Sequence, residues 1–157
     1  MTKITPFLWF DHQAEEAVNY YVSVFNNARV TDVARYAEGG MGVPGTVMTM
    51  SFELDGVTFT ALNGGPVFQF NPAVSFVIHC ADQAEVDYYW DKLGDGGKPG
   101  QCGWVEDRFG VTWQVVPDEL PGLLADPDPV IATRVTQAML AMTKLDIPAL
   151  KRARDGK

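Results

Sequence analysis

The sequence predicts an α+β protein built from two βαβββ modules and a set of C-terminal helices. Two internal echoes support a duplication. Gly110-Val111-Thr112-Trp113 repeats Gly56-Val57-Thr58-Phe59, and EVDYY at 85–89 repeats AVNYY at 17–21. Both echoes fall on matching elements in the same order, which favours duplication over chance. We therefore expect a single domain, 1–157, with module one at 4–63, module two at 74–117 and a helical extension at 118–157.

Module one begins with an apolar run rich in β-forming residues at 4–10, which predicts a strand. Asp11 stands where a helix cap is expected. The apolar residues that follow it have helical spacing: Ala14, Ala17, Val18, Tyr21, Val22 and Phe25. Residues 28–36 and 46–54 alternate as strands do, around the loop EGGMGVPG. Asp55-Gly56 then predicts a tight hairpin turn into a last strand at 57–63.

Module two repeats this order of elements. VSFVIHC at 74–80 predicts a strand, and Asp82 with Glu85 predicts a capped helix start. The helix is marked by a second apolar stripe: Val86, Tyr89, Trp90 and Leu93. The glycine-rich segment GDGGKPG leads to a strand around 101–106, and the turn at Phe109-Gly110 leads to a final strand at 111–116.

The composition changes after Pro117. LPGLLADPDPV reads as a Pro/Asp linker, and a helix is then predicted by apolar residues at helical spacing, namely Ile131, Val135, Ala138 and Met142. Asp146-Ile147-Pro148 predicts the start of a last short helix. Helices added to a β-rich core commonly cover a sheet edge or build an interface.

The chain has 157 residues, a net charge of -8 and a sequence pI of about 4.6. An acidic protein without a basic stripe is repelled by nucleic acids and anionic membranes, so we expect neither as a partner. No apolar run has the length of a membrane helix, and the N-terminus lacks the apolar region of a signal peptide. Cys80 and Cys102 form no CxxC motif. We expect a cytoplasmic location with reduced thiols.

Five motifs resemble the PhnB-like family, which is named 3-demethylubiquinone-9 3-methyltransferase and belongs to the vicinal oxygen chelate superfamily. That superfamily includes glyoxalase I, extradiol dioxygenases and bleomycin-resistance proteins. The motifs span nearly the whole chain: PFLWFDHQAEEAVNYYVSVF (6–25), PGTVMTMSFELDG (44–56), ALNGG (61–65), YYWDKL (88–93) and QCGWVEDRFGVTWQVVP (101–117). The resemblance implies paired βαβββ modules around a cleft, and a homodimer.

The methyltransferase name implies S-adenosylmethionine, which most methyltransferases hold against a glycine-rich loop between a strand and a helix. The glycine-rich stretches here are EGGMGVPG, NGG and GDGGKPG. Each is expected to connect or precede strands, and none opens a helix with GxGxxG. We therefore interpret them as hairpins or loops, and predict no cofactor.

Metal-dependent members of the superfamily hold one divalent ion on the first and last strands of each module. The GVT echo places Thr60 and Gln114 at the last-strand positions, where Gln114 replaces the glutamate of metal-binding relatives. The helix echo points to Phe7 or Trp9 on one first strand, and to Ser75 or Val77 on the other. These side chains lack the charge and basicity that bind transition ions. A divalent metal is possible on this scaffold, but this ligand set does not support one.

The residues expected to line a ligand pocket combine these positions with neighbours on the same strand faces: Phe7, Trp9, Thr60, Ser75, His79, Cys102, Trp104 and Gln114. Trp9 and Trp104 suit a flat or apolar ligand, although both could equally be core residues. His79 shares strand parity with Ser75, but an isolated histidine is more often structural. Cys102 favours a packed thiol over a nucleophile. Glu106 and Asp107 favour a solvated turn over an acid–base pair.

Three functions remain open from the sequence. The first is a metal-free protein that binds or sequesters a small organic molecule, as bleomycin-resistance relatives do. The second is an enzyme, either a metal-assisted isomerase, lyase or dioxygenase, or the methyltransferase of the family name. The third is an interaction protein whose cleft is vestigial. The missing carboxylate and histidine ligands favour the first. Fold alone does not decide among them.

Overall fold

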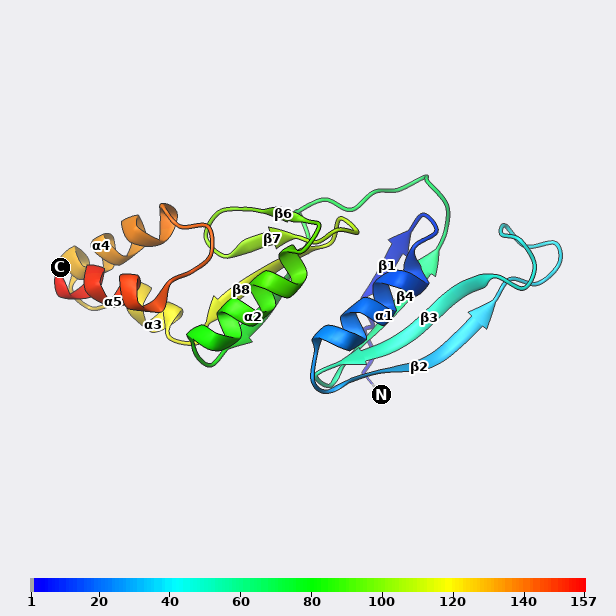
Figure 1. Cartoon of the computed structure of the whole chain (residues 1–157), viewed down its shortest axis with the longest axis horizontal. Coiled ribbons are helices and arrows are strands. Elements are labelled where there is room, and N and C mark those ends of the chain that lie inside the picture. The colour runs from blue at the N-terminus through cyan, green and yellow to red at the C-terminus, as the bar shows by residue number, and fades with distance from the viewer. Residues whose placement is uncertain (1) are drawn as a thin grey trace. The chain divides into compact units, whose positions relative to one another are not determined.

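A computed structural model describes residues 2–157. The chain divides into two compact units, one ending at Phe70 and the other beginning at Asn71. Each unit contains a four-stranded mixed sheet with an α-helix packed on one face (Figure 1). Within the described residues, no helix has both the length and the apolar character needed to cross a membrane.

The first unit contains one βαβββ module. Its elements are β1 (Phe7–Phe10), α1 (Ala14–Val24), β2 (Ala28–Arg35), β3 (Val47–Leu54) and β4 (Val57–Asn63). The strand order is β1-β4-β3-β2. β1 runs parallel to β4, whereas β4, β3 and β2 pair antiparallel.

The core of the first unit lies between α1 and its sheet. Side chains alternate along a strand, so Leu8 and Phe10 are buried while Phe7 and Trp9 face the other side. The helix buries Ala14, Ala17, Val18, Tyr21 and Val24. Phe52 is fully buried and stacks on Phe59 at a centroid distance of 5.3 Å. The helix α1 thus covers one face of the sheet and does not cover the face on which Phe7 and Trp9 lie.

The start of α1 differs from the prediction. Asp11 does not cap the helix; Gln13 occupies the N-cap position and makes no side-chain hydrogen bond there. Instead, Asn63 at the end of β4 accepts a hydrogen bond from the Ala14 backbone N–H at 2.8 Å. The Asn63 amide also donates to the Val47 carbonyl oxygen at 3.1 Å. A distant side chain therefore supplies the cap that the local residues do not.

The hairpin predicted at Asp55-Gly56 is confirmed. Leu54 pairs with Val57, so these two residues form the whole loop. Both have positive φ, 47° at Asp55 and 82° at Gly56. Two successive left-handed residues suit the tight turn that matches the twist of paired strands.

The second unit contains the other module, and its topology confirms the duplication and the predicted α+β fold. Its elements are β5 (Phe76–Cys80), α2 (Gln83–Gly94), β6 (Lys98–Pro99), β7 (Trp104–Glu106) and β8 (Thr112–Pro117). The strand order β5-β8-β7-β6 matches β1-β4-β3-β2 of module one. The capped start of α2 is also confirmed, since Asp82 Oδ1 accepts from the Glu85 N–H at 2.9 Å.

The strand predicted around 101–106 is too long. β7 begins at Trp104, and Cys102 lies in the preceding turn with a positive φ of 57°. The turn is closed by a hydrogen bond of 3.0 Å from the Trp104 N–H to the Gln101 carbonyl. The sequence predicted that Cys102 and Trp104 share a strand face. This prediction is wrong, because Cys102 lies outside the strand.

Three helices follow module two: α3 (Leu120–Leu124), α4 (Pro129–Leu140) and α5 (Ile147–Asp155). The predicted linker after Pro117 thus contains a short helix, in which Pro121 occupies the first turn, where proline is tolerated. The three helices share a core of buried side chains: Leu120, Val135, Leu145 and Leu150.

The C-terminal helices are bonded to module two through the segment between α4 and α5. The Gln83 amide donates to the Leu145 carbonyl at 3.1 Å and accepts from the Ile147 N–H at 2.8 Å. Backbone N–H groups of Cys102 and Gly103 donate to carbonyls at 142 and 143, at 2.9 and 2.7 Å. The extension is therefore an integral part of the second unit.

Candidate functional site

The strand registers define which positions correspond in the two modules. Phe7 pairs with Thr60 on the parallel strands β1 and β4, and Val77 pairs with Gln114 on β5 and β8. Thr60 and Gln114 are thus equivalent, in agreement with the GVT echo. The helix echo, at an offset of 68 residues, predicts that Phe7 corresponds to Ser75. This correspondence is wrong, because Ser75 precedes β5 and Val77 takes the equivalent place. The helix echo gave a register two residues off, since the loops between strand and helix differ.

These equivalent positions offer poor ligands for a metal ion. They present aromatic carbon at Phe7, a hydroxyl at Thr60, aliphatic carbon at Val77 and an amide at Gln114. Across residues 2–157, no cluster of three or more His, Cys, Asp or Glu side chains has the arrangement of a metal site. Neutral oxygen donors beside carbon do not fit a divalent transition ion, which prefers imidazole, thiolate or carboxylate ligands.

In module two, the structure brings three of the predicted residues together. The Gln114 Nε2 amide donates to the Ser75 hydroxyl at 2.8 Å, and Trp104 pairs with Gln114 across β7 and β8. His79 is exposed and lies beside Val116 in the sheet register. Gln114 therefore has a hydrogen-bond partner of its own, on the sheet face opposite α2.

Neither cysteine has the environment of a nucleophile. Cys102 donates a hydrogen bond from Sγ to the Met139 carbonyl at 3.5 Å, so its thiol faces the C-terminal helices. Burial, with smaller contributions from Glu85 and Asp118, raises the pKa of Cys80 to about 12. A thiol with that pKa stays protonated and inert at neutral pH.

Asp107 is not the solvated residue that the charged turn suggested. It is 2% exposed, and its Oδ1 accepts hydrogen bonds from the Phe109 and Val111 N–H groups at 2.9 and 3.0 Å. Its Oδ2 accepts from the Trp113 indole at 2.9 Å. These bonds shape the turn before β8, so the carboxylate has a structural role. Glu106 is the half-buried last residue of β7.

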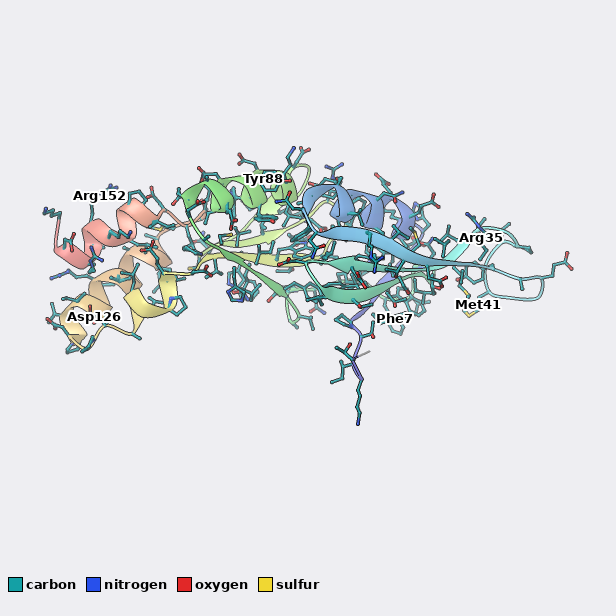
Figure 2. The ribbon with its side chains drawn as sticks, turned by 90° about the horizontal axis from the view of Figure 1, so that it is seen from below. Phe7, Arg35, Met41, Tyr88, Asp126 and Arg152 are labelled. Carbon is teal, nitrogen blue, oxygen red and sulfur yellow. The ribbon has the colours of Figure 1, made fainter. Side chains whose placement is uncertain are left out.

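A pocket of about 370 Å³ lies within module one, on the sheet face away from α1. Trp9 and Leu62, neighbours in the β1–β4 register, form one wall together with Met48 of β3. The other wall comes from the end of β2 and the β2–β3 loop, including Arg35 and Met41. Figure 2 shows these last two residues at the same end of the first unit.

The Trp9 side chain is held in place from three sides. Its indole N–H donates to the Gly65 carbonyl at 2.9 Å, and its ring meets Phe68 edge-on at a centroid distance of 5.0 Å. A Cβ added at Gly64 would lie 2.4 Å from the indole ring. The absence of a side chain at Gly64 therefore lets the ring lie directly on the backbone. The ALNGG motif therefore supplies the two glycines, Gly64 and Gly65, that contact the Trp9 side chain.

Tyr36 is held by the same two means. Its hydroxyl donates to the Asn63 carbonyl, and a Cβ at Gly42 would lie 2.3 Å from its ring. Both aromatic walls of the pocket thus pack against a glycine, and each is fixed by a hydrogen bond, Tyr36 to the last residue of β4 and Trp9 to Gly65 just after it. Such a pocket is formed before any ligand arrives.

The glycine-rich segments do not fit S-adenosylmethionine. Backbone N–H groups of Gly64 and Gly65 donate to the Phe10 and Asp11 carbonyls at 2.9 and 3.0 Å, so they are not free to bind an anion. EGGMGVPG joins the antiparallel strands β2 and β3, and GDGGKPG joins α2 to β6. None of the three segments lies between a strand and the start of a helix, the arrangement that typical methyltransferases use.

Trp9 is the one predicted pocket residue that lines this pocket. Phe7 and Thr60 share its sheet face but do not contribute to the lining, and the remaining predicted residues belong to the second unit. Sequence reasoning missed Arg35, Tyr36, Met41, Met48 and Leu62. Leu62 could have been found from Trp9, since parallel pairing of the first and last strands places the two side by side.

Comparison with known proteins gives a consistent answer. The family model described as 3-demethylubiquinone-9 3-methyltransferase matches residues 2–116. The PhnB protein from Bacillus cereus is 34% identical, with 74% of this chain and 99% of that chain covered and a TM-score of 0.68. None of the curated proteins compared with the chain matches it.

Two more distant structures show the fold alone. Protein PA1353 from Pseudomonas aeruginosa is 18% identical, covers 74% of this chain and 98% of its own, and has a TM-score of 0.63. The fosfomycin resistance protein FosX from Mesorhizobium loti is 12% identical, covers 80% and 100%, and has a TM-score of 0.52. With a family model that matches most of the chain and a relative of 34% identity, the chain belongs to the PhnB-like family, named 3-demethylubiquinone-9 3-methyltransferase.

Proposed function

We propose that this protein binds a small organic molecule in the module-one pocket, without a metal ion. The observation that carries the proposal is the pair of aromatic walls, Trp9 and Tyr36, each fixed against a glycine by its own hydrogen bond. Rigid aromatic surfaces lose little conformational freedom on binding, so they favour a ligand at low entropic cost. The volume of about 370 Å³ falls in the range of small-molecule sites.

The chemistry of the lining favours binding over catalysis. Apart from Arg35, the wall residues are aromatic, aliphatic, thioether or glycine. The Tyr36 hydroxyl donates a hydrogen bond to the Asn63 carbonyl, so its O–H is directed to the backbone and away from a ligand. General acid–base catalysis needs such a titratable group within hydrogen-bond reach of the substrate. A binding or sequestering protein needs none.

The enzyme alternative has two forms. A metal-assisted isomerase, lyase or dioxygenase would need stronger ligands than the hydroxyl of Thr60 and the amide of Gln114. Methyl transfer, which the family name describes, would need a binding mode for the methyl donor that does not use these glycine-rich segments. The pocket itself supports neither form.

We further propose that the protein is a homodimer. Two apolar side chains on α4 are exposed in the single chain, Val130 at 60% and Leu140 at 57%. A second copy of the chain would cover such side chains in a dimer. The C-terminal extension lies beyond residues 2–116, the part that the family model matches. Native mass spectrometry of the untagged protein would report the subunit number, any bound metal and any retained molecule in one measurement.

A fragment screen followed by NMR tests the binding site directly. Fragments are expected to shift the Trp9 indole N–H signal, identified by its loss in Trp9→Phe, and the amides of Gly64 and Gly65. The Trp104 indole, from module two, is the internal control and should not move. In the native mass spectrum, a divalent ion bound at one per chain would overturn the metal-free proposal. A screen in which no fragment moves the Trp9 signal would favour a vestigial site in an interaction protein.

A further inference from the structure

We infer that the ligand of the module-one pocket is a flat aromatic molecule with an anionic group, and that Arg35 binds the anion. The inference rests on the proposed function and names the chemical class of ligand. It draws on the shape of the walls, on the sulfur atoms among them, and on the charge at the rim.

The walls favour a flat ring. Trp9 and Tyr36 present aromatic surfaces that pack directly against Gly64 and Gly42, and each ring is also oriented by its hydrogen bond. Met41 and Met48 add thioether groups, which make favourable contacts with aromatic rings and adapt to their outline. A planar aromatic ligand can contact all four of these side chains, while a bulky aliphatic one gains less from fixed planar walls.

Arg35 places a positive charge at the edge of the same pocket. It is the last residue of β2, and its Nη1 donates to the Gly45 carbonyl at 3.1 Å, which tethers the guanidinium to the β2–β3 loop. A guanidinium has five N–H donors, so several remain for a ligand. Its planar fork matches the geometry of a carboxylate or a similar oxyanion.

A second arginine on the same strand shows the contrast. Arg29 forms an ion pair with Glu53, with Nε 3.0 Å from Oε2. Over residues 2–157, no carboxylate lies within 4.0 Å of the Arg35 guanidinium. In a chain of net charge -8, a cation that lacks an acidic partner and lines a pocket favours anions there and disfavours cations.

Two probes with the same ring system and different charge states, one anionic and one neutral, separate this inference from the proposed function. 2-Naphthoate and 2-naphthalenemethanol share one flat ring system, but only the first carries a carboxylate at neutral pH. Each is titrated into the full-length protein at low ionic strength, with the Trp9 indole signal as the reporter. We expect the naphthoate to bind about tenfold more tightly, as a charge-assisted hydrogen bond implies, and the preference to shrink as salt is added.

Arg35→Gln removes the charge and keeps a polar side chain of similar length. It is expected to reduce the preference to about twofold or less while the affinity for 2-naphthalenemethanol stays the same. Arg29→Gln, on the same strand but outside the pocket, is the matched control and should keep the wild-type preference. An unchanged preference in Arg35→Gln would overturn the role of Arg35.

The remaining outcomes are also distinguishable. Equal affinities of the two probes in the wild-type protein, with Trp9 shifted by both, would overturn the anionic class and leave the aromatic pocket supported. If neither probe moves the Trp9 signal while the spectrum shows a folded protein, the inference and the proposed function fall together.

Discussion

The two modules have the same strand order but use the equivalent loop, between the second and third strands, in different ways. In module one, residues 36–46 connect β2 to β3 and supply part of the pocket. In module two, residues 100–103 connect the equivalent strands β6 and β7, and the backbone N–H groups of Cys102 and Gly103 donate to the carbonyls at 142 and 143. A long loop has created a cavity in one module, while a short loop has become an anchor for helices in the other.

The two sheets also differ in strand length, and module one has the longer second and third strands. β2 and β3 each have 8 residues, whereas β6 has 2 and β7 has 3. Long strands carry Tyr36 and Met48 to one end of the sheet, where a loop can enclose a volume between them. Short strands cannot, and the second unit obtains extra core from α3, α4 and α5. The two modules thus share one topology but differ in what the ends of their strands support.

The largest effect is expected where the two turns before the last strands differ. Asp107 is buried and accepts hydrogen bonds from Phe109, Val111 and Trp113. Asp107→Asn places an N–H₂ donor against donors and removes the charge that strengthened these bonds. We expect a loss of about 2–4 kcal/mol in the free energy of unfolding, measured by urea denaturation, with faster amide hydrogen exchange in β8.

Asp55→Asn is the matched control in module one. Asp55 is exposed and has a φ of 47°, a conformation that asparagine tolerates well. The change in stability should stay within about 0.5 kcal/mol. Equal losses in the two variants would show that the buried carboxylate does not distinguish module two from module one.

The next effect concerns the pocket wall. Gly64→Ala places a Cβ where the Trp9 ring lies, so the ring must move. We expect about 1–3 kcal/mol of destabilisation and a weaker affinity for 2-naphthalenemethanol, by about tenfold. Gly122→Ala is the control, since a Cβ at that position in α3 meets nothing within 4 Å. Full affinity in Gly64→Ala would show that the fixed orientation of Trp9 is not needed for binding.

Local signals in the sequence predicted much of the fold. The Asp55-Gly56 turn and the Asp82 cap are set by residues within a few positions of each other, and both are confirmed. Asp107 was misread because its three donors become neighbours only after the turn has folded. Cys102 was placed on a strand although Gly100 and Gly103 flank it, and these two glycines are the local signal for the turn at 101–104.

The pocket could not be predicted because it joins distant segments. Trp9, Tyr36, Met48 and Leu62 come from four stretches of the chain, and the pairing of β1 with β4 and the path of the β2–β3 loop make them neighbours. Their packing also depends on Gly64, whose role is visible only once the ring above it is placed. An alternating strand pattern indicates which side chains share a face, but not where that face is hollow.

A smaller effect is expected at the anchor of the C-terminal helices. Gln83→Ala removes the bonds to Leu145 and Ile147. We expect a loss of about 1–3 kcal/mol and faster hydrogen exchange over residues 142–157. Gln137→Ala, an exposed change on α4, should leave exchange unaltered. Unchanged protection of α5 in Gln83→Ala would show that the shared core holds the helices without this clamp.

The smallest effect concerns the ion pair that accompanies this anchor. A hydrogen bond from Lys144, followed by one from Gln83, lowers the pKa of Asp87 below its ordinary value of 3.8. A lowered carboxyl pKa adds stability above the unfolded-state pKa and loses it as the pH falls through the folded-state pKa. Both side chains are more than one third exposed, so the contribution is under about 1 kcal/mol.

Lys144→Gln should therefore be slightly less stable than the wild-type protein near neutral pH, with the difference vanishing in acid and shrinking at high salt. In an NMR titration, the midpoint of Asp87 should rise toward 3.8 but remain below it, because the Gln83 bond persists. Lys92→Gln, an exposed change on the same helix α2, is the control. An unmoved midpoint would assign the lowered pKa to Gln83 alone, and the helices would then be held to module two by neutral hydrogen bonds rather than by charge.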